Sequence, residues 1–323
     1  MTISVNDRPL VTIALIAYNS EPFIREAVES VLAQTYSPLE IILSDDCSTD
    51  GSFAVICDLA RRYNGPHRVV VNRNATNLGG AEHISLMLEM ARGEFIVQAE
   101  GDDVSVPERT TKLVECWLKT NRSRDLICSY FAEINEGGQS TGYIKEDVMF
   151  MPDVNADVST WRCGATGATA SYTPKLYQKY GPIHHDVLAV DWVIPFRAWL
   201  EGGVEMVREP LIRHRTHSRS ISQQVKNLEI FPGRSERYAL RRKIAAGEVA
   251  TTQEWLKAWR IGRSGYDPKV ERDLERLIQI QIAERDVFDV NFVKRLGILA
   301  RVLRLGDPKA TLGLFIRHIL KIY

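Results

Sequence analysis

Polar and acidic residues follow three β-rich stretches of the sequence, each at the point where the stretch ends. The three clusters are AYN at 17–19, SDDCSTDGS at 44–52 and EGDD at 100–103. In an open parallel sheet, ligands bind beyond the carboxyl ends of the strands. One such cluster alone is explained as well by a turn or a helix cap, since Asp and Ser favour both. Three clusters at matching strand ends indicate one carboxylate-lined site.

A carboxylate-lined site repels a diphosphate ligand unless a divalent cation lies between them. Asp102 offers a hard oxygen ligand of the kind that suits Mg²⁺ or Mn²⁺. These ions commonly bind one or two protein carboxylates together with phosphate oxygens, and they neutralise charge on a departing diphosphate. The pattern therefore predicts Mg²⁺ or Mn²⁺ as the cofactor. NLGG at 77–80 can form a tight backbone turn close to the same site.

The elements that position these clusters alternate between strand and helix. Strand patterns cover 10–17, 39–43, 67–71 and 94–99, and the first is a continuous β-rich run that suits a strand buried on both faces. Amphipathic helical patterns lie between them, after Ser20 as a predicted cap and over 52–64 and 80–91. Strands that alternate with helices of about a dozen residues predict right-handed crossovers and a mainly parallel sheet. The predicted fold class is α/β.

The pattern changes twice further along the chain. A helix is expected from Pro107 to about 120, followed by a strand at 125–130 and a hairpin turn at 137–138. Further along, a helix is expected at 186–201, strands at 203–207 and 210–215, and helices throughout 234–323. We divide the chain into a nucleotide-sugar-binding half at 1–105, an acceptor-binding and catalytic half at 106–222, and a helical extension at 223–323. No internal repeat is visible.

Composition excludes several classes of protein. Lys and Arg together number 41, as do Asp and Glu, so no overall field recruits nucleic acid. The first residues show no signal peptide, and no segment reaches the ~18–20 apolar residues of a membrane-spanning helix. The odd number of cysteines, 5, without a CxxC pair, predicts reduced thiols in a cytoplasmic protein.

The order and spacing of several motifs together are more specific than any one of them. The run contains VTIALIAYN, QTY, DDCSTDGS, NLGG, ARGEF and EGDD. It resembles the nucleotide-binding half of the family 2 glycosyltransferases, densely over 10–115 and more sparsely to about 221. The resemblance implies a GT-A-type mainly parallel sheet flanked by helices, here followed by a C-terminal α-helical extension. It also implies sugar transfer with inversion at the anomeric carbon.

The resemblance assigns roles around the donor. Ala17 and Tyr18 are expected to pack on the nucleotide base or ribose, and Asp46, or Asp45 beside it, to accept a hydrogen bond from the base. A uracil or thymine imide can donate that bond, which favours a UDP- or dTDP-sugar. The NLGG segment adds Asn77 and Gly79 to the nucleotide-binding set.

The resemblance also assigns the metal ligands. Asp102 is expected to ligate the metal, with Asp103 nearby and His217 of RHRTHSRSIS as a third candidate. The family usually has Asp where this chain has Glu100, whose longer side chain reaches the ribose or a metal-bound water. Arg213 or Arg215 is a candidate phosphate partner. A solvated basic loop is the alternative interpretation of this segment.

The candidate general base lies in HHDVLAVDWVIPFRAWLEGG at 184–203. This segment resembles the family helix that carries an acidic pair, and it aligns Asp191 with the base, although the usual glutamate neighbour is Val190 here. An inverting displacement needs one carboxylate to take the acceptor proton. The alternative is that Asp191 caps the helix, with Pro195 near the helix start.

The predicted partners are a nucleotide-sugar donor and a saccharide or lipid-linked saccharide acceptor, in the synthesis of cell-surface polysaccharide or glycolipid. The basic amphipathic pattern at 291–304 could pack on the core, on a second subunit or on the inner face of a membrane. An alternative interpretation also stays open, namely a non-catalytic module that binds nucleotide sugar or acts as a scaffold. A sugar-phosphate nucleotidyltransferase would need a Gly-rich basic loop after the first strand, and IAYNSEPF has none.

Overall fold

The computed structural model describes most of the chain. The described residues are 8–146, 149–153, 156–161, 163–218, 220, 234–262, 267–286 and six positions between 297 and 305. The amphipathic segment at 291–304 therefore lies largely outside the described residues. None of the described helices has both the length and the apolar character needed to cross a membrane. All five cysteines are free thiols, as expected.

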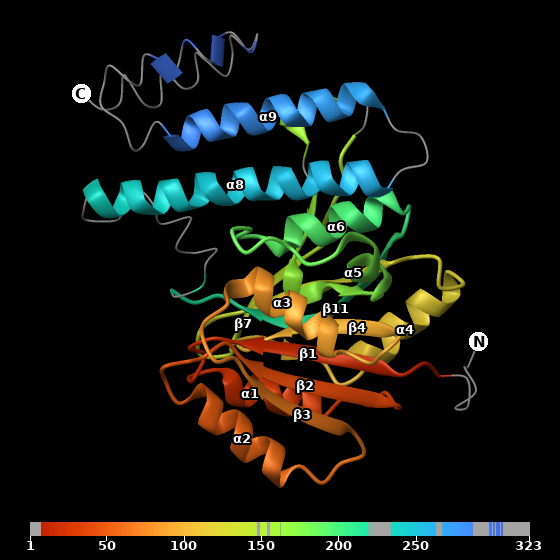
Figure 1. Ribbon diagram of the computed structural model, residues 1–323. Helices are drawn as coiled ribbons and strands as arrows, with labels where there is room; N and C mark the ends of the chain where they lie inside the picture. Colours follow the sequence, from red (N-terminus) through yellow and green to blue (C-terminus); the bar gives the residue numbers. More distant parts are fainter. Residues whose placement is uncertain are drawn as a thin grey trace.

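The first hundred residues form four parallel strands joined by helical crossovers (Figure 1). The strands are β1 (Val11–Ala17), β2 (Leu39–Asp45), β3 (Arg68–Arg73) and β4 (Phe95–Glu100). The helices between them are α1 (Ile24–Leu32), α2 (Ser52–Arg62) and α3 (Gly79–Met90). The α/β prediction is confirmed. Ser20 does not cap α1 through its side chain, because its carbonyl oxygen accepts the amides of Phe23 and Ile24 instead.

The second half of the chain extends the same sheet and makes it mixed. The order is β3-β2-β1-β4-β10-β6-β11-β5, and β7 pairs with β6. β10 is antiparallel to β4 and β6, whereas β11 is parallel to β6. The added strands are β5 (Val104–Ser105), β6 (Leu126–Ile134), β7 (Ser140–Lys145), β10 (Ser171–Tyr172) and β11 (Val204–Arg215). β8 (Met149–Phe150) and β9 (Gly164–Ala165) form a separate pair.

Two expectations for the second half need correction. The strands expected at 203–207 and 210–215 are one strand, β11, because a register shift between Val207 and Pro210 lets pairing with β6 continue past the proline. The helix expected from 186 is α6 (Val190–Leu200), which begins four residues later. The remaining helices of this half are α4 (Arg109–Lys119) and α5 (Lys175–Tyr180).

Alternate residues of the central strands build two hydrophobic layers. On β1, Ile13 and Leu15 face α1, α2 and α4, whereas Ala14 faces α3 and α6. This alternation follows from the two-residue period of a strand, and burial on both faces explains the continuous apolar runs. The sheet is thereby covered by helices on both faces.

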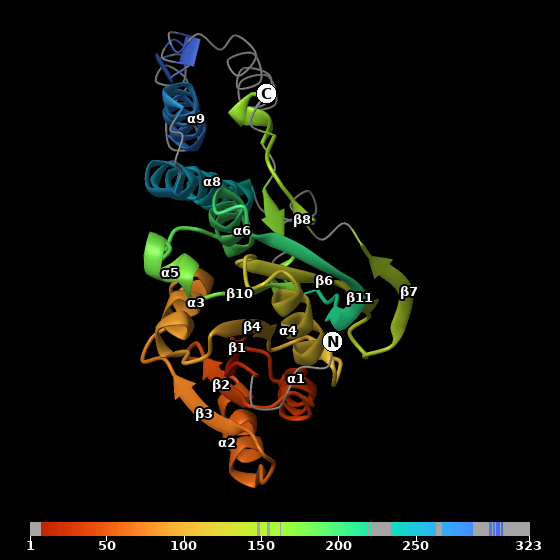
Figure 2. The ribbon, with the colours of Figure 1, turned by 90° about the vertical axis from the view of Figure 1, so that its right-hand side faces the viewer.

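Two long helices stack on the outer side of α6. α8 (Arg234–Gly262) packs against α6, and α9 (Pro268–Asp286) lies alongside α8, at the opposite end of the molecule from α2 and β3 (Figures 1 and 2). Trp255, Leu256 and Trp259 of α8 are buried in the same hydrophobic layer as α6. The helical extension therefore shares a core with the helix that carries Asp191.

Candidate active site

The three polar clusters lie side by side at one edge of the sheet. β1 separates β2 from β4, and the strand register places Ala17 opposite Asp45 and Ile16 opposite Glu100. The Asp46 amide continues the pairing by donating to the Ala17 carbonyl oxygen at 2.8 Å. The shared edge follows from parallel pairing, because the carboxyl ends of neighbouring strands coincide.

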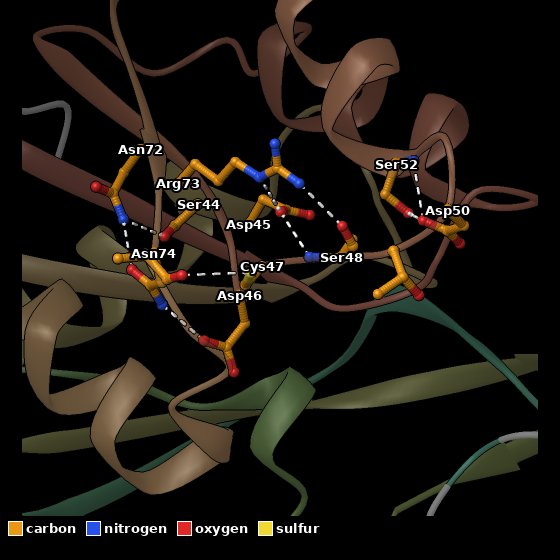
Figure 3. A network of polar contacts seen from close by, with 12 residues as sticks. Ser44, Asp45, Asp46, Cys47, Ser48, Asp50, Ser52, Asn72, Arg73 and Asn74 are labelled. Atoms are coloured by element: carbon orange, nitrogen blue, oxygen red, sulfur yellow. Dashed lines mark hydrogen bonds and ion pairs between the residues drawn. The ribbon is translucent and has the colours of Figure 1, made fainter.

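Asp46 is committed to hydrogen bonds within the protein (Figure 3). One carboxylate oxygen accepts from Asn74 Nδ2 at 2.7 Å and from the Leu78 amide at 2.9 Å, and the other accepts from the Gly79 amide at 2.9 Å. A carboxylate at the amino terminus of α3 satisfies amides that have no partner within the helix. Asp46 thus fixes the NLGG turn against the tip of β2.

Asp45 is buried and only partly satisfied. Its Oδ1 accepts from the Ser48 amide at 2.9 Å and lies 3.5 Å from Nε of Arg73. Its Oδ2 is buried and has no hydrogen-bond partner among the described residues. Arg73 also donates to the Ser48 carbonyl oxygen at 3.0 Å, so the guanidinium closes this side of the loop (Figure 3). Sequence analysis did not identify Arg73, because an Arg at a strand end carries no distinguishing signal.

The remaining predicted nucleotide-binding residues differ in exposure. The Tyr18 ring is half exposed and Asn77 is exposed. Ala17 is buried, and its methyl group lies against Gly101, so it packs the end of β1 against the acidic turn. Gly79 has a φ of 76°, a conformation that side chains rarely adopt, and this places its amide on Asp46.

The acidic turn after β4 gathers three carboxylates. One oxygen from each of Glu100, Asp102 and Asp103 lies within 4.8 Å of the others. Burial raises the pKa of Glu100 well above its ordinary value, and the charges of Asp103 and Asp102 raise it further. Such crowding is relieved by a cation, and carboxylate oxygens are the ligands that Mg²⁺ and Mn²⁺ prefer.

β11 and the residues after it bring two histidines to this turn. His217 Nε2 lies 2.9 Å from Asp102 Oδ2, and its ring packs on Phe23 with a centroid distance of 4.7 Å. His214 Nδ1 lies 3.0 Å from Asp103 Oδ2. Burial alone would lower the pKa of His214, but the charge of Asp103 raises it to about 9. The predicted set of Asp102, Asp103 and His217 is therefore brought together.

Arg215 is a structural clamp. Its side chain is buried, and its amide donates to Asp103 Oδ1 at 2.8 Å. Its guanidinium donates to the carbonyl oxygens of Asp102 and Glu136 and to the Glu26 carboxylate. Because these bonds engage the guanidinium, the phosphate-binding role considered for Arg215 is not supported. The clamp instead fixes the backbone of the acidic turn.

Asp191 lies at the start of α6, where its carboxylate is bound to a neighbouring turn. Its Oδ2 accepts from the Gly167 amide at 3.0 Å. A Cβ at position 167 would come within 2.2 Å of Asp191 Oδ1, so a side chain there would displace the Asp191 carboxylate. The N-cap is Ala189 and Pro195 lies inside the helix, which argues against Asp191 as the capping residue. Burial raises the pKa of Asp191 to about 6, against the opposing effects of Gly167 and His214.

Asp191 lies close enough to the acidic turn to interact with it electrostatically. The charge of Asp191 contributes to the raised pKa of Glu100, and His214 interacts electrostatically with both carboxylates. Arg109 connects β4 with the turn that binds Asp191. Its buried guanidinium donates to the carbonyl oxygens of Gln98 and Ala168 at 2.8 and 2.6 Å. Sequence analysis missed Arg109, because a single Arg in an amphipathic helix resembles a surface residue.

Three features of the site are chemically complementary. An exposed aromatic ring and a buried carboxylate lie at the tips of β1 and β2, and a cluster of carboxylates with a histidine lies at the tip of β4. A separate carboxylate with a raised pKa lies on α6 and interacts electrostatically with Glu100 of this cluster. With a divalent cation at the carboxylate cluster, this arrangement can hold a nucleoside diphosphate, and the carboxylate on α6 can accept a proton.

Solved structures share the fold. TarS of S. aureus (residues 1–349 in complex with UDP) superposes with a TM-score of 0.57 at 15% identity, over 94% of this chain and 82% of that one. The mannosyltransferase PcManGT of Pyrobaculum calidifontis, in complex with GDP-Man and Mn²⁺, superposes with a TM-score of 0.55 at 18% identity, over 99% and 82%.

Sequence relatives are nearer but cover less of the chain. The putative glycosyltransferase EpsE of Bacillus subtilis is 33% identical over 134 residues, which are 42% of this chain and 47% of that protein. An uncharacterized Mycobacterium tuberculosis protein, Rv1520, is 28% identical over 65% of this chain and 60% of its own length. The chain thus spans about half to three fifths of these relatives. The model of glycosyl transferase family 2 matches residues 12–180, more than half of the chain, and the protein belongs to that family.

Proposed function

We propose that this glycosyltransferase moves a sugar from a nucleoside diphosphate donor to a hydroxyl group of a saccharide or lipid-linked saccharide, with inversion at the anomeric carbon. The observation that carries the proposal is the convergence of Asp45, the Glu100–Asp103 turn and Asp191 at one edge of the sheet. Two proteins of the same fold are described as bound to UDP and to GDP-Man with Mn²⁺, which supports a nucleotide-sugar donor.

The nucleoside is proposed to lie between Tyr18 and the tip of β2. The exposed Tyr18 ring offers an apolar face for the base. Of the two aspartates, Asp45 is the better partner for an imide N–H, because its Oδ2 has no other partner in the described structure. Asp46 already accepts three hydrogen bonds and is assigned to hold the NLGG turn. A uracil or thymine base suits this site, which favours a UDP- or dTDP-sugar.

A divalent cation is proposed to bind at the acidic turn. Asp102 and His217 would hold it, with Glu100 beside them, whereas both oxygens of Asp103 already accept hydrogen bonds. A mixed carboxylate and imidazole set suits Mn²⁺ better than Mg²⁺. When bound, the ion neutralises charge on the departing diphosphate. Asp103 is assigned to position His214 and the backbone of Arg215.

Asp191 is proposed to be the general base. Its raised pKa of about 6 makes it a stronger base than an ordinary aspartate, while it still ionises at neutral pH. The Gly167 amide holds the carboxylate in place. One carboxylate is enough, since the acceptor oxygen displaces the diphosphate directly and its proton passes to Asp191. Val190 therefore does not prevent catalysis.

The test is hydrolysis and transfer from a panel of UDP-, dTDP- and GDP-sugars with MnCl₂. We expect release of the nucleoside diphosphate by the wild type, none by Asp102→Ala at any Mn²⁺ concentration, and a loss of about 10²-fold or more in turnover by Asp191→Asn. Asp186→Asn, an exposed aspartate in the preceding loop, is the matched control and should keep full activity. Calorimetric titration with UDP should show that Asp191→Asn still binds nucleotide.

The other outcomes select among the alternatives. Pyrophosphate released from a nucleoside triphosphate and a sugar phosphate would identify a nucleotidyltransferase. Nucleotide-sugar binding without turnover would identify a binding module. Full activity of Asp102→Ala would refute the metal site, and unchanged turnover of Asp191→Asn would move the base to another residue.

A further inference from the structure

An exposed indole adjoins the proposed general base. Trp192 follows Asp191 on α6, and 43% of its surface is accessible, which is unusual for so large an apolar side chain. Leu188, just before the helix, is 40% exposed. Other tryptophans of this region, such as Trp161, Trp255 and Trp259, are buried. The Trp192 ring lies over Gly164 and the Asp191 carboxylate lies at Gly167, so exposed apolar surface begins close to the proposed base.

The Trp192 ring is held in place from beneath by the helical extension. The buried Trp255 of α8 stacks on Trp192 with a centroid distance of 6.5 Å and an interplanar angle of 13°. Trp255 also donates its Nε1–H to the Trp192 carbonyl oxygen at 2.9 Å. Side-chain order is therefore established before a ligand binds, which lowers the entropy cost of binding. Trp192 is therefore exposed on an ordered surface.

A second aromatic residue stands on the same side of the neighbouring strand pair. A Cβ at Gly164 of β9 would lie 3.3 Å from Cδ1 of Trp192, so the indole occupies the space above this glycine. Phe150 of β8 is the register partner of Gly164, and directly opposed residues share one face of a sheet. Phe150 is 48% exposed. Trp192 and Phe150 therefore border the same surface next to Asp191.

We infer that Trp192 is the acceptor platform, and that the acceptor is a pyranoside whose apolar C–H face lies on the indole while one hydroxyl reaches Asp191. Binding sites for small polar molecules combine apolar and aromatic walls with a few polar groups that fix orientation. A sugar ring has an apolar C–H face and polar hydroxyl groups, so it needs an apolar wall and a polar group. Here the indole and the carboxylate belong to consecutive residues of α6. This inference rests on the proposed function, and it assigns the acceptor class and the residue that selects it.

The experiment compares two kinds of acceptor in one assay. Transfer from the active donor is measured to methyl β-glucopyranoside, methyl β-galactopyranoside and methyl α-mannopyranoside, and to glycerol, which has hydroxyl groups but no ring. Hydrolysis of the donor by water serves as the measure of an intact donor site. The variants are Trp192→Ala, Trp192→Phe and Tyr143→Ala. The last removes a half-exposed aromatic residue from β7, at the outer edge of the sheet and away from α6 (Figure 2).

We expect Trp192→Ala to raise KM for the pyranosides about tenfold or more while donor hydrolysis and transfer to glycerol stay unchanged, which corresponds to about 1.4 kcal/mol. Trp192→Phe should recover most of the loss, and Tyr143→Ala should behave as the wild type. A wild type that uses no pyranoside better than glycerol, or a Trp192→Ala variant with unchanged pyranoside KM, overturns the inference. Loss of donor hydrolysis in Trp192→Ala also overturns it, since the role would then be structural. A wild type that hydrolyses no donor refutes the proposed function itself.

Discussion

Replacing Asp191 with Asn should stabilise the protein at neutral pH while it removes turnover. The carboxylate is partly buried at the start of α6, and this burial raises its pKa from 3.8 to about 6. An ionised Asp191 is therefore less favourable in the folded state than in the unfolded chain. Asparagine carries no charge, and its side-chain oxygen can still accept the Gly167 amide that Oδ2 accepts in the wild type.

The magnitude follows from the shift in pKa. The difference between 3.8 and about 6 is about two units, and each unit corresponds to about 1.4 kcal/mol. The upper bound at pH 8 is thus about 3 kcal/mol, and screening by water at the partly exposed carboxylate reduces it to about 1–3 kcal/mol. The folded pKa is raised, so this destabilisation is absent below the unfolded pKa and complete above the folded one. At pH 5 about half of it should remain.

The assay is urea unfolding of the wild type and Asp191→Asn at pH 5 and pH 8. The effects of titrating groups that do not interact with Asp191 are common to both proteins and cancel in the difference between them, whereas Glu100 and His214 interact with Asp191 and contribute to that difference. We expect Asp191→Asn to be more stable at both pH values, with the larger difference at pH 8. A variant less stable than the wild type at pH 8, or a difference that does not grow between pH 5 and pH 8, would refute the burial argument.

Three further perturbations test other parts of the structure. Asp46→Ala should lower the free energy of unfolding by about 2–4 kcal/mol, because three hydrogen bonds to the buried carboxylate are lost. Asp58→Ala, on the exposed side of α2, should change the free energy of unfolding little. Equal effects of the two substitutions in urea unfolding would contradict the structural role of Asp46. Glu254→Ala should lower the free energy of unfolding by about 3–5 kcal/mol, because it leaves the buried Arg197 guanidinium without its carboxylate partner. Lys257→Ala removes an exposed partner of Glu254 and should change the free energy of unfolding little. Turnover at saturating donor should fall about tenfold per pH unit below about pH 6, where Asp191 becomes protonated; a rate independent of pH between 5 and 7 would exclude Asp191 as the base.

Sequence alone predicted the framework that holds the site. The apolar runs and their helical crossovers follow from local periodicity, and parallel pairing then requires the clusters after β1, β2 and β4 to share one edge. The acidic turn and His217 were recognised by residue type and order, and they are brought together as expected. These features could be predicted because each depends on a short segment and on rules of strand connection.

Packing decided what individual side chains do within that framework. Asp45 and Asp46 are adjacent in sequence, yet Asp46 is bound by Asn74 and the start of α3, while Asp45 keeps one oxygen unpaired among the described residues. Arg215 appeared available for phosphate and is a buried clamp on the acidic turn. In both cases the hydrogen-bond partners lie more than twenty residues away in the chain, so they cannot be predicted from the local sequence.

The packing partner of α8 was likewise decided only by the tertiary structure. Its amphipathic pattern specifies an apolar stripe but not the surface that covers it. In the folded protein Trp255 lies against Trp192, 63 residues earlier, and its indole N–H is bonded to the backbone of α6. Sequence periodicity determines which face of a helix is buried, whereas the partner depends on the shape and hydrogen-bonding groups of a surface that exists only after the sheet and α6 have assembled.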